Sequence, residues 1–124
     1  MENSVIKYNN RKTGKQYEEK ATEFLIKNGV KILDRNFALK GGEIDIIGRD
    51  ENSIIFVEVK YRKNATHGRP YESVNIKKQK SICRIATMYI KIKKLPNNGS
   101  FRFDVISILD NEIIWYKNAF NYQI

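Results

Sequence analysis

The chain has 124 residues, with 23 Lys or Arg against 14 Asp or Glu, which leaves a formal net charge of +9 with His neutral. This length allows one domain with a modest core, and 41% hydrophobic with 30% charged residues excludes a disordered or fibrous chain. No apolar run approaches the roughly 20 residues of a membrane helix, and the N-terminus lacks the apolar segment of a secretion signal. A single cysteine, Cys83, suits a reducing compartment, so we expect a cytoplasmic protein that makes no contact with membranes.

The hydrophobic pattern of the first half predicts a helix followed by three strands. After a loose arm over residues 1–10, apolar side chains recur at helical spacing over residues 15–28, and Gly29 offers a left-handed cap. Alternating patterns and turn residues then predict strands at residues 30–37 (with a polar break at 34–36), 43–48 and 54–61.

The second half predicts one more helix and two more strands. Ser73 is the expected N-cap of a helix that runs to about Lys91, and the break at residues 96–99 separates it from the strands. The apolar stripe of this helix is Ile82, Ile85, Ala86, Tyr89 and Ile90, and the strands cover residues 101–109 and 112–116. The order α-β-β-β-α-β-β predicts a single α/β domain with a mixed central sheet flanked by helices.

The residues that indicate chemistry lie on the second and third strands. Because alternate side chains of a strand share a face, Glu43 lies with Asp45, and Glu58 lies with Lys60. If the hairpin turns at residues 51–52, Asp45 is opposite Glu58 and Glu43 is opposite Lys60. Two opposed carboxylates destabilise a sheet, and a hard divalent cation such as Mg²⁺ neutralises them through oxygen ligands. Such an ion can activate a water and stabilise charge on a phosphoryl oxygen, while a nearby lysine supports the attacking hydroxide or the charged transition state.

The alternative is an ordinary hairpin with a solvated polar face, and a register slip of one residue would separate Asp45 from Glu58. The coincidence of two acids, a lysine and apolar neighbours in a basic chain favours a site. For Asp104, within a good strand pattern, we prefer a structural hydrogen-bonding role. For Cys83, without a second sulfur, we prefer apolar packing.

At these residues the chain resembles a known group of enzymes. Asp45 followed by Glu58-x-Lys60 looks like the metal site of the PD-(D/E)xK nuclease superfamily. Over nearly its whole length the chain resembles the bacterial YraN (UPF0102) family, whose members are similar to archaeal Holliday junction resolvases. The most specific matches are residues 42–45 and 56–60. Further matches are Gly14, Tyr17, Glu18, Ala21, Arg35, Asn36, Arg62, Lys78, Ala86, Tyr89 and residues 102–105 and 118–120.

The resemblance implies a restriction-endonuclease-like fold and a site that depends on Mg²⁺ or Mn²⁺. It assigns Asp45 and Glu58 as metal ligands, Lys60 as the catalytic lysine and Glu18 as the acidic residue of the first helix. Without the resemblance, Glu18 is equally well explained as a solvated helix residue. Ile44 stands where many members of the superfamily have proline, a change that the superfamily tolerates.

Basic residues gather after the third strand and at the start of the second helix. Such groups neutralise phosphates without reading sequence, and no base-reading motif accompanies them. The candidates for binding nucleic acid are Arg62, Lys63, Arg69, Lys77, Lys78 and Lys80.

The leading hypothesis is a metal-dependent endonuclease that hydrolyses phosphodiester bonds in DNA, with branched DNA as one candidate substrate. The competing hypotheses are a catalytically inactive module with this fold that binds nucleic acid or a protein, and a basic structural protein. A homodimer would suit an enzyme that cuts two strands symmetrically, although no sequence feature demands one.

Overall fold

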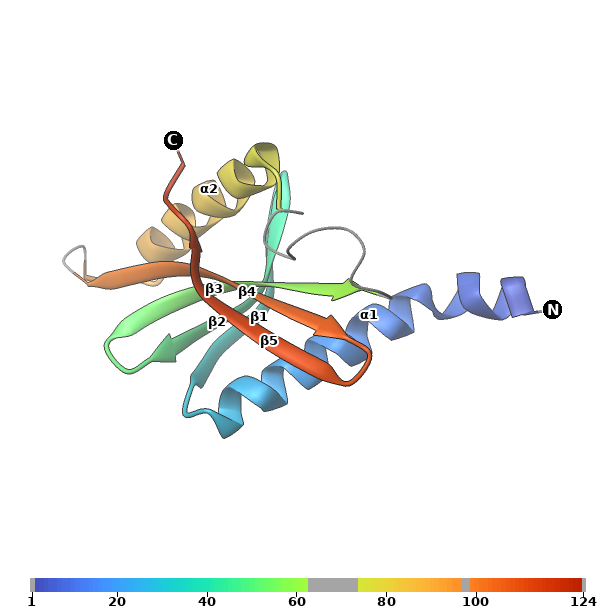
Figure 1. Ribbon diagram of the computed structural model, residues 1–124. Coiled ribbons are helices and arrows are strands. Elements are labelled where there is room, and N and C mark those ends of the chain that lie inside the picture. The colour runs from blue at the N-terminus through green and yellow to red at the C-terminus, as the bar shows by residue number, and fades with distance from the viewer. Residues whose placement is uncertain (1, 63–73, 97–98, 124) are drawn as a thin grey trace.

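The computed structural model describes residues 2–62, 74–96 and 99–123, with side chains from residue 14 onwards. Five strands form one sheet, and two helices pack against it (Figure 1). In chain order the elements are α1 (Glu2–Lys27), β1 (Lys31–Leu39), β2 (Gly42–Asp50), β3 (Ser53–Arg62), α2 (Ile76–Ile92), β4 (Ser100–Leu109) and β5 (Glu112–Phe120). The predicted α/β class and the predicted order of elements are therefore confirmed.

Alternation along β3 gives the sheet two apolar faces, one for each helix. Phe56 belongs to the cluster that contains Ile85 of α2, whereas its neighbour Val57 belongs to the cluster that contains Leu25 of α1. The two helices therefore cover opposite faces, as Figure 1 shows. A residue on β3 can thus be assigned to the α1 face or the α2 face from its position in the strand.

The strands lie across the sheet in chain order, β1-β2-β3-β4-β5. All neighbours are antiparallel except β3 and β4, which are parallel and are joined through α2. A parallel connection needs a long crossover, whereas the antiparallel pairs close through short turns. Gly41, Glu51 and Asp110 provide the positive φ angles in these turns, at 92°, 55° and 54°.

The element ends differ in places from the sequence expectations. Helix α1 begins at Glu2, within the residues for which we expected a loose arm, and β5 extends to Phe120. The N-cap of α2 is Asn75, because its side chain accepts a hydrogen bond of 2.9 Å from the Lys78 amide. Ser73, the expected cap, lies outside the described residues.

Helix α2 packs with the apolar stripe that its sequence predicts. Its buried residues are Ile82, Cys83, Ile85, Ala86 and Tyr89, and Ile90 packs against the same cluster. Cys83 is a free, fully buried thiol, so its predicted role as a small apolar side chain is confirmed. In the part of the chain that the structure describes, neither helix is long and apolar enough to cross a bilayer.

Asp104 is fully buried in β4 and its carboxylate is saturated with donors. It accepts hydrogen bonds from Arg102, from the Trp115 indole at 2.9 Å and from the Asn118 amide at 2.9 Å. Arg102 also pairs with Asp50 at 2.7 Å. A carboxylate with this many donors, one of them a guanidinium, has no need of a metal ion, which confirms its structural role and separates it from the candidate site.

Candidate metal centre

The candidate site forms where β2 separates from β3. The predicted register is confirmed from Ile46, which pairs with Val57, to Asp50, which pairs with Ser53. The ladder then stops, although β2 begins at residue 42 and β3 continues to residue 62. Residues 42–44 of β2 stay paired with β1, while β3 stays paired with β4. The two strands therefore diverge next to the predicted acids.

Asp45 lies at the point of divergence, where its side chain replaces a strand partner. The Asp45 carboxylate accepts a hydrogen bond of 2.8 Å from the backbone amide of Val59. A buried amide at the end of a ladder needs an acceptor, and this one is supplied by a side chain instead of a β2 carbonyl. The hydrogen bond fixes the Oδ2 atom of Asp45 against β3.

Three carboxylates converge at this point from two elements. Oxygen atoms of Glu18 on α1, Glu43 and Asp45 on β2 all lie within 4.8 Å of one another. Burial, then the neighbouring Asp45 carboxylate, raise the pKa of Glu18, while a hydrogen bond with Asn36 opposes the rise. Hard oxygen ligands at this spacing fit Mg²⁺ or Mn²⁺, which prefer carboxylates and water.

Glu58 joins the cluster from the adjacent strand and is only 6% exposed. Its carboxyl group is hydrogen-bonded to that of Asp45, and its Oε2 atom lies 3.4 Å from the Lys78 ammonium. Burial first, and then Glu58, raise the pKa of Asp45 to about 8. Two carboxyl groups this close share a proton or need a cation, since both cannot be ionised without compensation.

Asn36 is a residue of the site that the sequence indicated only indirectly. It lies opposite Asp45, between the pairs Arg35–Ile46 and Phe37–Ile44, and its φ angle is 52°. Asparagine adopts this left-handed conformation more readily than most residues. The predicted polar break at residues 34–36 was the available signal, but nothing in it indicated that Asn36 would face Glu18.

Lys60 shares the α2 face of β3 with Glu58 and is half-buried. The predicted opposition of Glu43 and Lys60 is wrong, because the β2–β3 ladder ends before it reaches either residue. Glu43 lies instead with Glu18 and Asp45. Sequence reasoning treated Glu43 as a partner for a lysine, and the alternation that places it beside Asp45 was the signal for its role as a third acid.

The residues predicted to bind nucleic acid divide into three groups. Lys77 and Lys80 are exposed in the first turns of α2, and Arg62 is half-buried at the end of β3. Lys78 is directed at Glu58, so in this structure it compensates a buried acid. Lys63 and Arg69 lie outside the described residues.

The fold and the site define an α/β protein with a carboxylate cluster at a divergence of strands. A family model, "Uncharacterised protein family UPF0102", matches residues 17–108 and so includes Glu18, Asp45, Glu58 and Lys60. The chain belongs to the UPF0102 family, as the sequence predicted.

Similar proteins of this family occur in several bacteria. A UPF0102 protein of Fusobacterium nucleatum is 46% identical over 110 residues, which cover 89% of this chain and 92% of the relative. One from Clostridioides difficile is 48% identical over 114 residues, covering 90% and 99%. A chain from a solved structure entitled "Structure of EndoMS-dsDNA2 complex" matches with a TM-score of 0.37 and 22% identity, over 71% of this chain and about a third of the other.

The raised pKa of Asp45 predicts a particular pH dependence of stability without divalent cations. Between the ordinary value of 3.8 and about 8, the folded state keeps a proton that the unfolded state has released. The free energy of unfolding therefore falls as the pH rises through this range. Asp45→Asn resembles the protonated form. Its free energy of unfolding should equal that of the parent at about pH 4 and exceed it at about pH 8. Urea unfolding in EDTA measures both.

Asp50→Asn is the control with the opposite sign, because Arg102 lowers the pKa of Asp50. This variant should be less stable than the parent near neutrality, and the difference should disappear as the pH falls. A stability difference between Asp45→Asn and the parent that stays the same at both pH values would contradict the proposed environment of Asp45.

Proposed function

We propose that this protein is a metal-dependent endonuclease that hydrolyses phosphodiester bonds in DNA. The observation that carries the proposal is the convergence of Glu18, Glu43 and Asp45 within 4.8 Å, beside Glu58 and at the same strand end as Lys60. Carboxylates this close together repel one another, and a cation that joins them removes this cost. The complete Asp and Glu-x-Lys pattern, in a member of UPF0102, supports the same reading.

The donor set of the cluster fits a hard divalent cation. Asp45 is the shared member, since it is hydrogen-bonded to Glu58 and also lies with Glu18 and Glu43. We propose Asp45 and Glu58 as ligands, with Glu18 and Glu43 as further oxygen donors, directly or through water. When bound, Mg²⁺ or Mn²⁺ would neutralise negative charge that develops on the phosphoryl oxygens.

The residues of the chain itself would divide the remaining tasks. Val59 orients Asp45 through its backbone hydrogen bond, and Asn36 orients Glu18. Lys60, on the same face of β3 as Glu58, would hold the attacking water or stabilise charge in the transition state. Lys78 neutralises Glu58 and would be released towards a phosphate once a cation takes over this task.

The basic residues around the cluster would hold the DNA backbone. Lys77 and Lys80 are exposed on α2, next to Lys78, and Arg62 ends β3 two residues after Lys60. Contacts of this kind give affinity that depends on salt and not on sequence. Branched DNA, a homodimer and a cytoplasmic location remain predictions.

A second candidate function is a binding module that retains this fold without turnover. The observation that favours it is the ion pair of Lys78 with Glu58, which compensates the buried acid without any metal. A module of this kind would bind nucleic acid through its basic residues and would have no need for divalent cations.

The nuclease proposal predicts metal-dependent cleavage that requires Asp45 and Lys60. With Mg²⁺ or Mn²⁺, Asp45→Asn and Lys60→Ala should each lower the initial rate on branched or linear DNA by about 100-fold or more, because each removes a group acting on the reacting phosphate. Gel separation of labelled DNA gives these rates. Asp110→Asn and Lys31→Ala make the same chemical changes at exposed positions and should cleave like the parent. Equal background cleavage by all five proteins would reject the catalytic claim.

Calorimetric titration with Mn²⁺, in the absence of DNA, separates the two candidate functions. The nuclease proposal predicts uptake that Asp45→Asn and Glu58→Gln abolish and that Asp110→Asn leaves unchanged. Lys78→Ala should bind Mn²⁺ more tightly, by about tenfold, because it removes the cation that competes for Glu58. Salt-dependent DNA binding with no Mn²⁺ uptake in any of these proteins would favour the module.

A further inference from the structure

Two adjoining pockets lie along α2 and share Thr87 and Tyr122 in their walls. The first has a volume of about 470 Å³ and is lined by Lys77, Lys80 and Arg84, together with small and polar groups. Among the described residues that line it there is no carboxylate. The described charged residues of the first pocket are therefore all cations, which suits an anionic ligand.

The cations of this pocket form a row along the helix. Lys77, Lys80 and Arg84 are spaced by three and four residues, so they lie on one face of α2 and span about 10 Å. The Arg84 guanidinium is anchored by a hydrogen bond of 3.0 Å to the Lys40 carbonyl. A guanidinium has five N–H donors, so this bond leaves others for a ligand. The row suits several successive phosphates better than a single anion.

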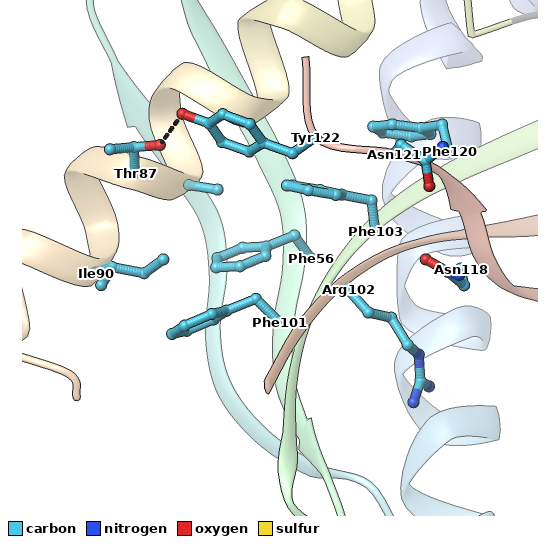
Figure 2. A pocket seen from close by; sticks show the side chains of 11 residues that line it. Phe56, Thr87, Ile90, Phe101, Arg102, Phe103, Asn118, Phe120, Asn121 and Tyr122 are labelled. Atoms are coloured by element: carbon cyan, nitrogen blue, oxygen red, sulfur yellow. Dashed lines mark hydrogen bonds between the residues drawn. The ribbon is translucent and has the colours of Figure 1, made fainter. Parts of the chain in front are cut away.

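The second pocket, of about 360 Å³, has aromatic walls (Figure 2). Its rings come from β3, β4, β5 and the C-terminal segment: Phe56, Phe101, Phe103, Phe120 and Tyr122. Tyr122 is 55% exposed at the border with the basic pocket, and its hydroxyl forms a hydrogen bond of 2.9 Å with Thr87. Polar side chains also line the pocket, namely Thr87, Arg102, Asn118 and Asn121.

The joined surface suits one ligand that is anionic along its length and carries flat apolar groups. A duplex presents phosphates but keeps its bases stacked inside, so it cannot use the aromatic pocket. An acidic peptide matches the cations but has no reason to place flat rings in the second pocket. A single strand of nucleic acid has both features, because bases stack on aromatic side chains while phosphates meet cations.

We propose that this surface binds single-stranded nucleic acid, with phosphates along Lys77, Lys80 and Arg84 and an unpaired base in the pocket bordered by Tyr122. The inference rests on the proposed function, since it names the form of substrate presented to the site. Lys77 is adjacent in sequence to Lys78, which contacts Glu58 of the candidate metal centre. A strand held along α2 therefore leads from the carboxylate cluster towards the aromatic pocket.

The test measures binding by fluorescence anisotropy in EDTA, so that cleavage plays no part. The probes are a labelled DNA single strand of about 12 nucleotides, a blunt duplex of equal length and an acidic peptide of similar charge. The parent should prefer the single strand, and Tyr122→Ala should weaken single-strand binding by about tenfold, since one stacked base is lost. Tyr122→Phe keeps the ring and should bind within about twofold of the parent.

The phosphate contacts are tested separately from the stacking contact. Lys77→Ala/Lys80→Ala should weaken binding and lower the salt dependence by about 1.4 in the log–log slope, because two phosphate contacts are lost. Lys27→Ala/Lys31→Ala removes the same charge from two exposed positions near the end of α1 and should have a much smaller effect.

Several outcomes would overturn the proposal. These are single-strand affinity that Tyr122→Ala leaves unchanged, equal affinity for single strand and duplex, and tighter binding of the peptide than of DNA. The result is independent of catalysis. If binding depends on Tyr122 but no cleavage occurs, only the nuclease proposal is rejected. If cleavage depends on Asp45 but Tyr122→Ala binds like the parent, only the single-strand proposal is rejected.

Discussion

Just past the end of the β2–β3 ladder, the Val59 amide donates a hydrogen bond of 2.8 Å to the Asp45 carboxylate and not to the main chain of β2. This bond exists because β2 stays paired with β1 while β3 stays paired with β4. The two central strands therefore separate beyond the Ile46–Val57 pair. The bond holds Asp45 between the two strands. Glu58 reaches Asp45 from β3, and Glu18 of α1 and Glu43 of β2 lie close to it as well. The candidate centre is thus a consequence of sheet topology and one side-chain acceptor.

The electrostatics of the cluster follow from this geometry. Burial and neighbouring carboxylates raise the pKa of both Asp45 and Glu18, so the site without metal retains protons that exposed acids would lose. Lys78 supplies a single positive charge to Glu58. By contrast, Asp104 is fully buried and is satisfied by Arg102 and by neutral donors. This difference in donors separates the candidate metal centre from the structural network around Asp104.

Much of the fold was predictable because its signals are local. The helical stripe of α2, the alternation along β3 and the turn at residues 51–52 each depend on neighbours in sequence, and the register through Ile46 followed from that turn. Asp45, Glu58 and Lys60 became candidates for the same reason, because their pattern is also local in sequence. The end of the ladder could not be predicted, because it depends on β1 and β4 competing for the central strands. The prediction that Glu43 lies opposite Lys60 was wrong for that reason. The contact of Asn36 with Glu18 joins β1 to α1, so it depends on how this helix packs on the sheet.

The central claim is that these carboxylates form a site for a divalent cation, and anomalous diffraction from crystals grown with Mn²⁺ tests it most directly. The account predicts a single strong anomalous peak at about 2.0–2.2 Å from an Asp45 oxygen, because octahedral ions of this size bind carboxylates at that range. At least one oxygen of Glu18, Glu43 or Glu58 should lie at a similar distance from the peak. Lys78 should then have moved away from Glu58. Saturating Mn²⁺ that gives no peak at Asp45, with the Lys78–Glu58 pair intact, would contradict the account.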